Sequence, residues 1–168
     1  MSVWLANKLQ KKGVTIDVDY VSRLALLHDL FKVVALESLG ANRFHSYVHN
    51  EEEITMWKEL RQKFPGMHEG EGSYLMFKDD FPELAVSLRN LGKKEECWEE
   101  TIVHYADWRV FQNKVVEVGE RLSYLREAYP HHHHNWSEDE ERINLTERKI
   151  FELLQLTPQE MQKELEAA

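Results

Sequence analysis

The 168-residue sequence contains almost no cysteine, no long apolar run and fewer basic than acidic side chains. Cys97 is the only cysteine, so an intrachain disulfide cannot form and a reducing compartment is favoured. No apolar run approaches the ~20 residues of a membrane helix, and no signal peptide opens the chain. The net charge of −9 opposes non-specific nucleic-acid binding, which depends on Lys and Arg meeting phosphates. We therefore expect a soluble, cytoplasmic protein with neither a membrane nor a nucleic-acid partner.

Apolar residues recur at helical spacing along most of the chain, and neither internal repeats nor a strand-rich region is visible. This pattern predicts an all-α fold. We expect a compact helical domain over residues 1–130 and a C-terminal helical extension over residues 131–168 that packs on it. Helix boundaries are predicted at Gly13, at an N-cap on Asp17, at Pro65-Gly66 and at Pro82.

Two patterns in the C-terminal half make sharper predictions. The segment from Glu95 to Tyr129 keeps a helical period throughout, which predicts one long helix with a kink near Gly119. Ser137-Glu138-Asp139-Glu140 predicts a capping box at the start of a helix that runs to about Leu156. Thr157-Pro158-Gln159-Glu160 predicts a second capping box for a short last helix.

Polar residues interrupt the apolar pattern at two places that are far apart in the sequence. His28, Asp29 and Lys32 follow the apolar run 24–27, and Asp107 lies within the apolar stretch 102–110. Such groups are costly to desolvate unless they are paired or bind a metal. Imidazole and carboxylate form a natural N/O ligand pair for a divalent cation. We therefore predict one buried polar site built from two helices, with Lys32 on the same helical face as His28.

These motifs resemble those of the HD-domain metal-dependent phosphohydrolases. The resemblance is carried by Leu26-Leu27-His28-Asp29 with Lys32, by Ala106-Asp107-Trp108-Arg109-Val110, and by a middle His-x-x-x-Gly segment within Met67 to Leu75. It covers roughly residues 1–125 and implies an HD-like helical bundle. It also implies that His28, Asp29, Asp107 and His68 bind metal, that Asp29 and Lys32 are catalytic, and that Lys32 and Arg109 bind substrate.

The function implied by the resemblance is metal-dependent hydrolysis of a nucleotide or another small phosphate ester. The cofactor would be a divalent ion, with Mn, Mg, Co, Ni, Fe and Zn all compatible with N and O ligands. A homodimer is also compatible with the resemblance. The chain departs from the family pattern at two histidines, because the first would fall before Met1 and another is replaced by Leu91. Two alternatives follow: a catalytically degenerate module that binds a ligand or partner without turnover, or a part of a longer enzyme.

Each candidate residue also has a structural interpretation. His28 and Asp29 could form a buried hydrogen-bonded pair, and Lys32 could extend its ammonium group into water. Arg109 could form a surface ion pair, and His68 could be a solvated histidine at a helix end. Three further sets of histidines have no assigned role in the site: His45 and His49 are expected in solvent, His104 in the packing, and His131 to His134 in a polar loop.

Overall fold

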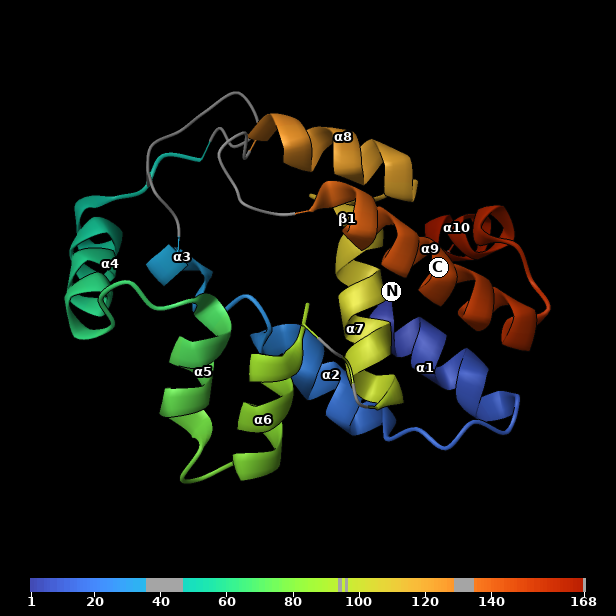
Figure 1. Ribbon diagram of the computed structural model, residues 1–168, viewed down its shortest axis with the longest axis horizontal. Coiled ribbons are helices and arrows are strands. Elements are labelled where there is room, and N and C mark those ends of the chain that lie inside the picture. Colours follow the sequence, from blue (N-terminus) through green and yellow to red (C-terminus); the bar gives the residue numbers. More distant parts are fainter. Residues whose placement is uncertain (36–46, 94, 96, 129–134, 168) are drawn as a thin grey trace. The chain divides into compact units, whose positions relative to one another are not determined.

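The computed structural model describes residues 1–35, 47–93, 95, 97–128 and 135–167. Over these ranges the predicted all-α class is confirmed, since helices account for every regular element except one small hairpin (Figure 1). The elements are α1 (Ser2–Lys11), α2 (Val18–Leu27), α3 (Lys32–Ala35), α4 (Glu51–Lys63), α5 (Glu69–Phe77), α6 (Pro82–Asn90), α7 (Trp98–Arg109), β1 (Val110–Phe111), β2 (Lys114–Val115), α8 (Val118–Ala128), α9 (Trp136–Leu154) and α10 (Pro158–Glu166). No helix within the described ranges has both the length and the apolar character needed to cross a membrane.

The polypeptide divides into two compact units. Unit 1 comprises Met1–Ser22 and Glu96–Ala168, and unit 2 comprises Arg23–Glu95. Helices α9 and α10, which the sequence predicts as an extension, belong to unit 1 together with α1, α7 and α8. The candidate residues are divided between the two units. His28, Asp29, Lys32 and His68 belong to unit 2, and Asp107 and Arg109 belong to unit 1.

Unit 1 is built around α7, which packs against α1, α8 and α9 (Figure 1). Its inward-facing residues are fully or almost fully buried: Leu5, Leu9, Ile102, Tyr105, Leu122, Ile143, Ile150 and Met161. Gly13 ends the first helical segment at a φ of 89°, a left-handed conformation that favours glycine and agrees with the prediction. The burial of one apolar stripe on each helix is what holds these elements together.

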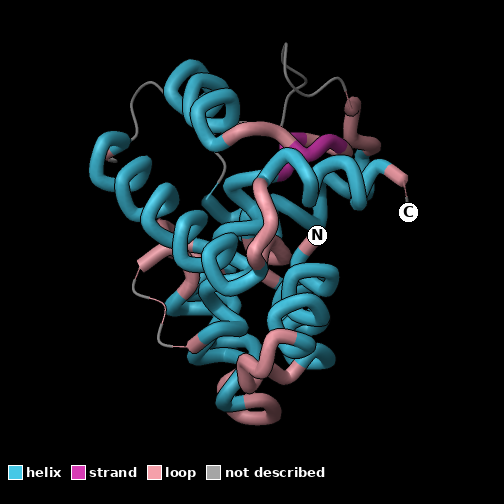
Figure 2. Tube along the Cα trace, turned by 90° about the vertical axis from the view of Figure 1, so that its right-hand side faces the viewer, coloured by secondary structure: helices cyan, strands magenta, loops and turns pink. Residues whose placement is uncertain are grey.

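The long helix predicted between Glu95 and Tyr129 is wrong, because a β-hairpin separates α7 from α8. Val110 pairs with Val115 and Phe111 with Lys114, and Gln112 turns the backbone at a φ of 55°. Figure 2 shows the two strands in magenta, and the rest of the described trace is helix and loop. Valine and phenylalanine also suit strands, so the apolar spacing fits either structure. A hydrogen bond of 2.6 Å from Arg109 Nε to Val116 O fixes the returning strand.

Unit 2 has its own core, formed by Phe31, Val33, Val34 and Phe64, with Trp57, Leu60 and Met67 packed against it. Helix α3 contributes to it and packs against α4 and α5, while α5 and α6 pack closely on each other. The rings of Phe31 and Phe64 meet edge to face at 5.3 Å. A Cβ added to Gly72 would lie 2.7 Å from Phe31 Cδ1, so this core requires glycine at position 72.

Most predicted helix ends are confirmed, and one is wrong. The Asp17 carboxylate accepts the Tyr20 N–H at 2.9 Å, and Pro82 opens α6. Thr157 and Glu160 form the predicted capping box of α10. Ser137 does not cap α9, because the N-cap is Asn135, two residues earlier, and the helix starts at Trp136. His45 and His131 to His134 lie outside the described residues.

Candidate functional site

His28 and Asp29 lie in a turn of unit 2 and not inside a helix, which corrects the prediction. Helix α2 ends at Leu27, and the turn that follows has hydrogen bonds of 3.1 Å from Leu30 N to Leu27 O and 3.0 Å from Lys32 N to Asp29 O. Phe31 is 3% exposed, whereas Leu30 is 52% exposed. Burying Phe31 in the core thus accompanies the break in the helix, and the turn presents His28 and Asp29 at the surface of the unit.

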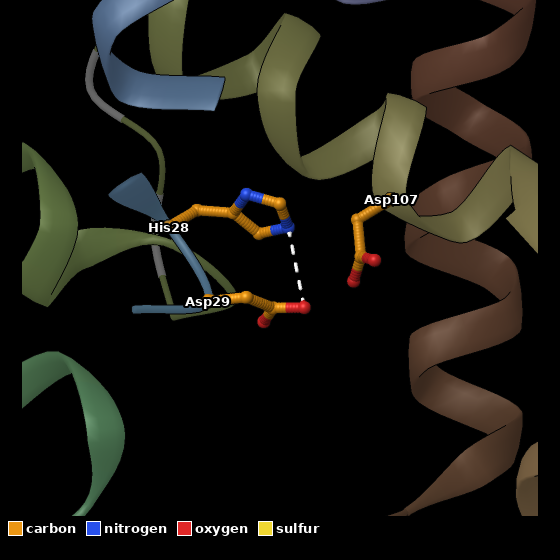
Figure 3. Close-up of side chains that lie close together, drawn as sticks. All are labelled: His28, Asp29 and Asp107. Carbon is orange, nitrogen blue, oxygen red and sulfur yellow. Dashed lines mark ion pairs between the residues drawn. The ribbon is translucent and has the colours of Figure 1, made fainter. Parts of the chain in front are cut away.

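The ring of His28 has a defined orientation. Its Nδ1 lies 2.8 Å from the Ala25 carbonyl oxygen, which can only accept a hydrogen bond, so Nδ1 carries the proton. In the neutral ring the lone pair is then on Nε2, which lies 3.7 Å from Asp29 Oδ2 (Figure 3). Two donors bound to one ion at ~2.1 Å would be roughly 3.0–3.4 Å apart. A small movement would therefore bring both atoms into one coordination sphere.

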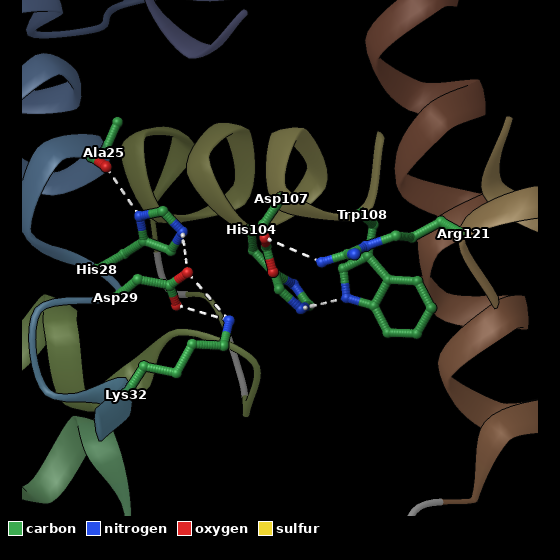
Figure 4. Close-up of polar contacts among 8 residues, drawn as sticks. All are labelled: Ala25, His28, Asp29, Lys32, His104, Asp107, Trp108 and Arg121. Atoms are coloured by element: carbon green, nitrogen blue, oxygen red, sulfur yellow. Dashed lines mark hydrogen bonds and ion pairs between the residues drawn. The ribbon is translucent and has the colours of Figure 1, made fainter. Parts of the chain in front are cut away.

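Lys32 pairs with Asp29. Its Nζ lies 3.0 Å from both carboxylate oxygens of Asp29 (Figure 4). Lys32 begins α3 and does not share a helix with His28, so the predicted common helical face is wrong. The side chains of Lys32 and Asp29 are 37% and 42% exposed, so this pair contributes at most about 1 kcal/mol to stability. It can exchange for other partners at little cost.

Asp107 lies on α7 in unit 1 and pairs with Arg121 of α8. Its Oδ1 is 3.6 Å from a terminal nitrogen of Arg121 (Figure 4). The Arg121 guanidinium also lies over the rings of Phe111 and Tyr124, at 5.9 and 5.2 Å. Asp107 belongs to unit 1, whereas His28 and Asp29 belong to unit 2. A single metal site that joins the three residues therefore stays a prediction.

Arg109 belongs to a buried polar network in unit 1. It is 2% exposed, donates from one terminal nitrogen to the Tyr105 hydroxyl at 2.9 Å, and forms an ion pair with Glu147 through the same nitrogen. The Tyr105 hydroxyl in turn donates to Glu147 at 2.6 Å, and burial raises the pKa of this tyrosine. Arg109 therefore forms an ion pair in the core, not on the surface. Its contact with substrate stays a prediction and would require this network to open.

The described histidines outside the His28 turn, which are His49, His68 and His104, have structural contacts. His68 is the exposed N-cap of α5, where its Nδ1 accepts the Gly70 N–H at 3.3 Å. Among the described residues it belongs to no group of three or more potential metal ligands. His104 Nε2 accepts a hydrogen bond of 3.1 Å from Trp108, in line with the packing interpretation. His49 packs against Trp57 with ring centroids 4.1 Å apart and an angle of 51° between the ring planes.

Cys97 has no features of a nucleophile. It is the N-cap of α7, and burial raises the pKa of its thiol to about 11. At neutral pH the group is almost entirely in the thiol form, which is the unreactive one.

Comparisons with protein families, curated proteins and solved structures gave no match to this protein. The interpretation of the site consequently rests on its residues and on the motif resemblance. Sequence reasoning missed two features. One is Arg121, the partner of Asp107, whose role no recognisable sequence motif indicates. The other is the Tyr105–Arg109–Glu147 network, for which the only local signal is the spacing of Tyr105 and Arg109 by four residues on a buried helix face.

Proposed function

We propose that this protein is a metal-dependent phosphohydrolase that cleaves a nucleotide or another small phosphate ester. The observation that supports this most directly is the geometry of the His28 turn. A backbone carbonyl orients the imidazole, and Nε2 lies 3.7 Å from an oxygen of the neighbouring carboxylate. Such hydrogen bonds from the second ring nitrogen are typical of histidines that bind metals.

By the motif resemblance, the ligands of the proposed site would be His28 and Asp29 of unit 2 together with Asp107 of unit 1. Nitrogen and oxygen donors of this kind suit Mn, Mg, Co, Ni, Fe or Zn as divalent ions. A bound ion would polarise a phosphoryl oxygen and lower the pKa of a coordinated water. In this proposal Arg121 acts on Asp107 as a positioning residue, since it pairs with that carboxylate at 3.6 Å.

Lys32 supplies the positive charge for the substrate in this proposal. Its ammonium group lies 3.0 Å from both Asp29 oxygens. When those oxygens turn toward a cation, Lys32 can donate to a phosphoryl oxygen and stabilise the negative charge that develops in the transition state. Asp29 then has two tasks, which are to hold the ion and to orient the attacking water.

The test compares Asp107→Asn with Asp79→Asn, which removes an exposed carboxylate in unit 2 that pairs with Lys78. Both variants carry replacements of His131 to His134, so that only the proposed site takes up metal. We measure Mn²⁺ binding by calorimetry and phosphate release from a panel of nucleoside monophosphates. We expect at most one metal per protein molecule. Asp107→Asn should lower metal affinity by at least ~10–100-fold and reduce phosphate release, and Asp79→Asn should change neither.

A stability measurement separates ligand loss from structural damage. The Asp107 side chain is 35% exposed and that of Arg121 is 12% exposed, and asparagine keeps an oxygen that can accept from Arg121, so the substitution should cost only about 1 kcal/mol. The metal-free Asp107→Asn variant should therefore unfold at nearly the wild-type urea concentration. A loss of several kcal/mol, or equal metal binding by the two variants, would contradict the proposed role of Asp107.

The second candidate function is a degenerate module that binds a phosphorylated ligand without turnover. Leu91, at the position of a family histidine, favours it, because this residue is the C-cap of α6 and offers no ligand atom. This alternative predicts metal or ligand binding that depends on His28 and Asp107, with no phosphate released from any ester in the panel.

A further inference from the structure

Unit 2 contains a hollow that is both charged and apolar. Its volume is about 450 Å³, within the range of small-molecule sites. Its lining consists of Asp29, Leu30, Phe31, Lys32, Val33, Met56, Trp57 and Leu60. Asp29 and Lys32 provide a charged pair, and the other six side chains are apolar. The hollow therefore continues directly from the turn that carries the proposed metal ligands.

The apolar wall of the hollow is held in place by the core of unit 2. Trp57 and Leu60 pack against the cluster that contains Phe31 and Phe64. The Trp57 ring is also in contact with the ring of His49 at 4.1 Å, and His49 pairs with Glu53 at 3.5 Å. The indole of Trp57 is thus held in place by His49, which precedes the N-cap of α4 and is itself paired with Glu53 of that helix. A supported aromatic surface can stack a ligand ring with little loss of side-chain freedom.

The rim of the hollow exposes apolar surface to water. Leu30 and Met56 are 52% and 51% exposed. A wholly polar ligand would leave this apolar surface unused. A wholly apolar ligand would desolvate Asp29 and Lys32 without compensation, which is unfavourable. The ligand that satisfies both parts carries an anionic group next to a ring.

We propose that this hollow binds the aromatic part of a phosphate monoester, with the phosphate group at Lys32. The assignment rests on the proposed function, because Asp29 and Lys32 belong to both sites. It deepens that function by selecting aromatic esters over phosphate esters of small polar alcohols. Selectivity comes from the apolar surface formed by the rim residues Leu30 and Met56 and the wall residues Trp57 and Leu60, and the charged pair supplies only the common anchor.

The test uses two ligands that cannot be hydrolysed and that differ in one group, phenylphosphonate and methylphosphonate. Their affinities for the full-length protein are measured by calorimetry in the presence of Mn²⁺. We expect phenylphosphonate to bind at least about tenfold more tightly, as stacking of one ring on an aromatic side chain allows. The double variant Leu30→Gln/Met56→Gln should reduce this ratio to about threefold or less, because it makes the rim polar at nearly constant volume.

The matched control is Leu75→Gln/Met76→Gln on α5. These residues are 37% and 44% exposed and lie outside the lining of the hollow, so the ratio should stay at the wild-type value. Equal affinities for the two phosphonates, an absence of binding, or the same ratio in both double variants would overturn the assignment. A preference for phenylphosphonate in a protein that releases no phosphate from any ester would support the hollow and refute the phosphohydrolase.

Discussion

The two units use the same kinds of charged residue in opposite ways. In unit 1, Arg109 is 2% exposed and its donors meet Tyr105, Glu147 and a backbone carbonyl. In unit 2, Asp29 and Lys32 are 42% and 37% exposed and pair with each other near the surface. Breaking a buried network whose members bond to one another costs much free energy, whereas an exposed ion pair can exchange partners at little cost in free energy. Burial therefore indicates which charged group is structural and which is able to serve a ligand.

The largest expected effect comes from breaking the buried network. Arg109→Leu leaves Glu147 and the Tyr105 hydroxyl without their cationic partner in a poorly solvated place. We expect the free energy of unfolding to fall by about 3–5 kcal/mol. The equivalent change in unit 2, Lys32→Leu, removes an exposed pair and should cost no more than about 1 kcal/mol. Urea denaturation of both variants measures the difference.

The contrast between the units would be lost if the two leucine variants had similar stabilities. Lys8→Leu provides a control within unit 1, because Lys8 pairs with Glu164 at the surface and the two side chains are 33% and 43% exposed. Its free energy of unfolding should resemble that of Lys32→Leu. A large loss in Lys8→Leu would show that location in unit 1, and not burial, determines the cost.

A smaller effect is expected from Gly72→Ala in unit 2. The added Cβ would approach Phe31 Cδ1 to 2.7 Å, so the ring must move and the core must adjust. We expect a loss of about 1–3 kcal/mol, together with weaker binding of phenylphosphonate, since Phe31 also lines the hollow. Thermal unfolding and calorimetry measure the two effects.

Gly119→Ala in unit 1 is the matched control for this change. Gly119 lies on α8, and apart from its chain neighbours and the nearby backbone of its own helix no atom is within 4 Å of the position that its Cβ would occupy. Alanine is the better helix former, so this variant should be about 0.5–1 kcal/mol more stable than the wild type. Destabilisation by both alanines would indicate that the close approach of Phe31 is not the cause.

The smallest effect concerns two helix starts within unit 1. Thr157→Ala removes the hydroxyl that accepts the Glu160 N–H at 3.2 Å and should cost about 1 kcal/mol. Ser137→Ala should change the free energy of unfolding by less than about 0.5 kcal/mol, because Ser137 lies within α9 and is not its N-cap. Chemical denaturation distinguishes the two outcomes, and equal losses would contradict the assigned caps.

The helices are predictable because their signals are local. Each signal determines the helical structure only within a few residues of its own position. These signals are the apolar period and the helix-end residues Gly13, Asp17, Pro82 and Thr157. The hairpin at Val110 is not predictable from the same pattern, because its valines and phenylalanine fit a helix equally well. The hydrogen bond from Arg109 to the Val116 carbonyl oxygen accompanies the hairpin and forms only once the backbone has folded back, so no local pattern in the sequence reveals it.

The sequence allows the residues of the candidate site to be identified, but not their positions in the fold or their partners. His28, Asp29 and Lys32 can be identified because polar groups interrupt an apolar run. Their place in a turn depends on the burial of Phe31 among residues of α3 and α4, some of them far along the sequence. The role of Arg109 depends on Glu147, a partner 38 residues away that no local pattern identifies.

The hydrogen bond from His28 to Ala25 has a consequence for the helix that precedes it. Ala25 is among the last four residues of α2, whose carbonyl groups have no amide partner within the helix. The imidazole therefore caps the carboxyl end of α2. Any electrophile that withdraws electron density at Nε2 makes Nδ1–H a stronger donor and tightens this cap. The rate of amide hydrogen exchange in the last turn of α2 therefore depends on whether an electrophile is bound at Nε2 of His28.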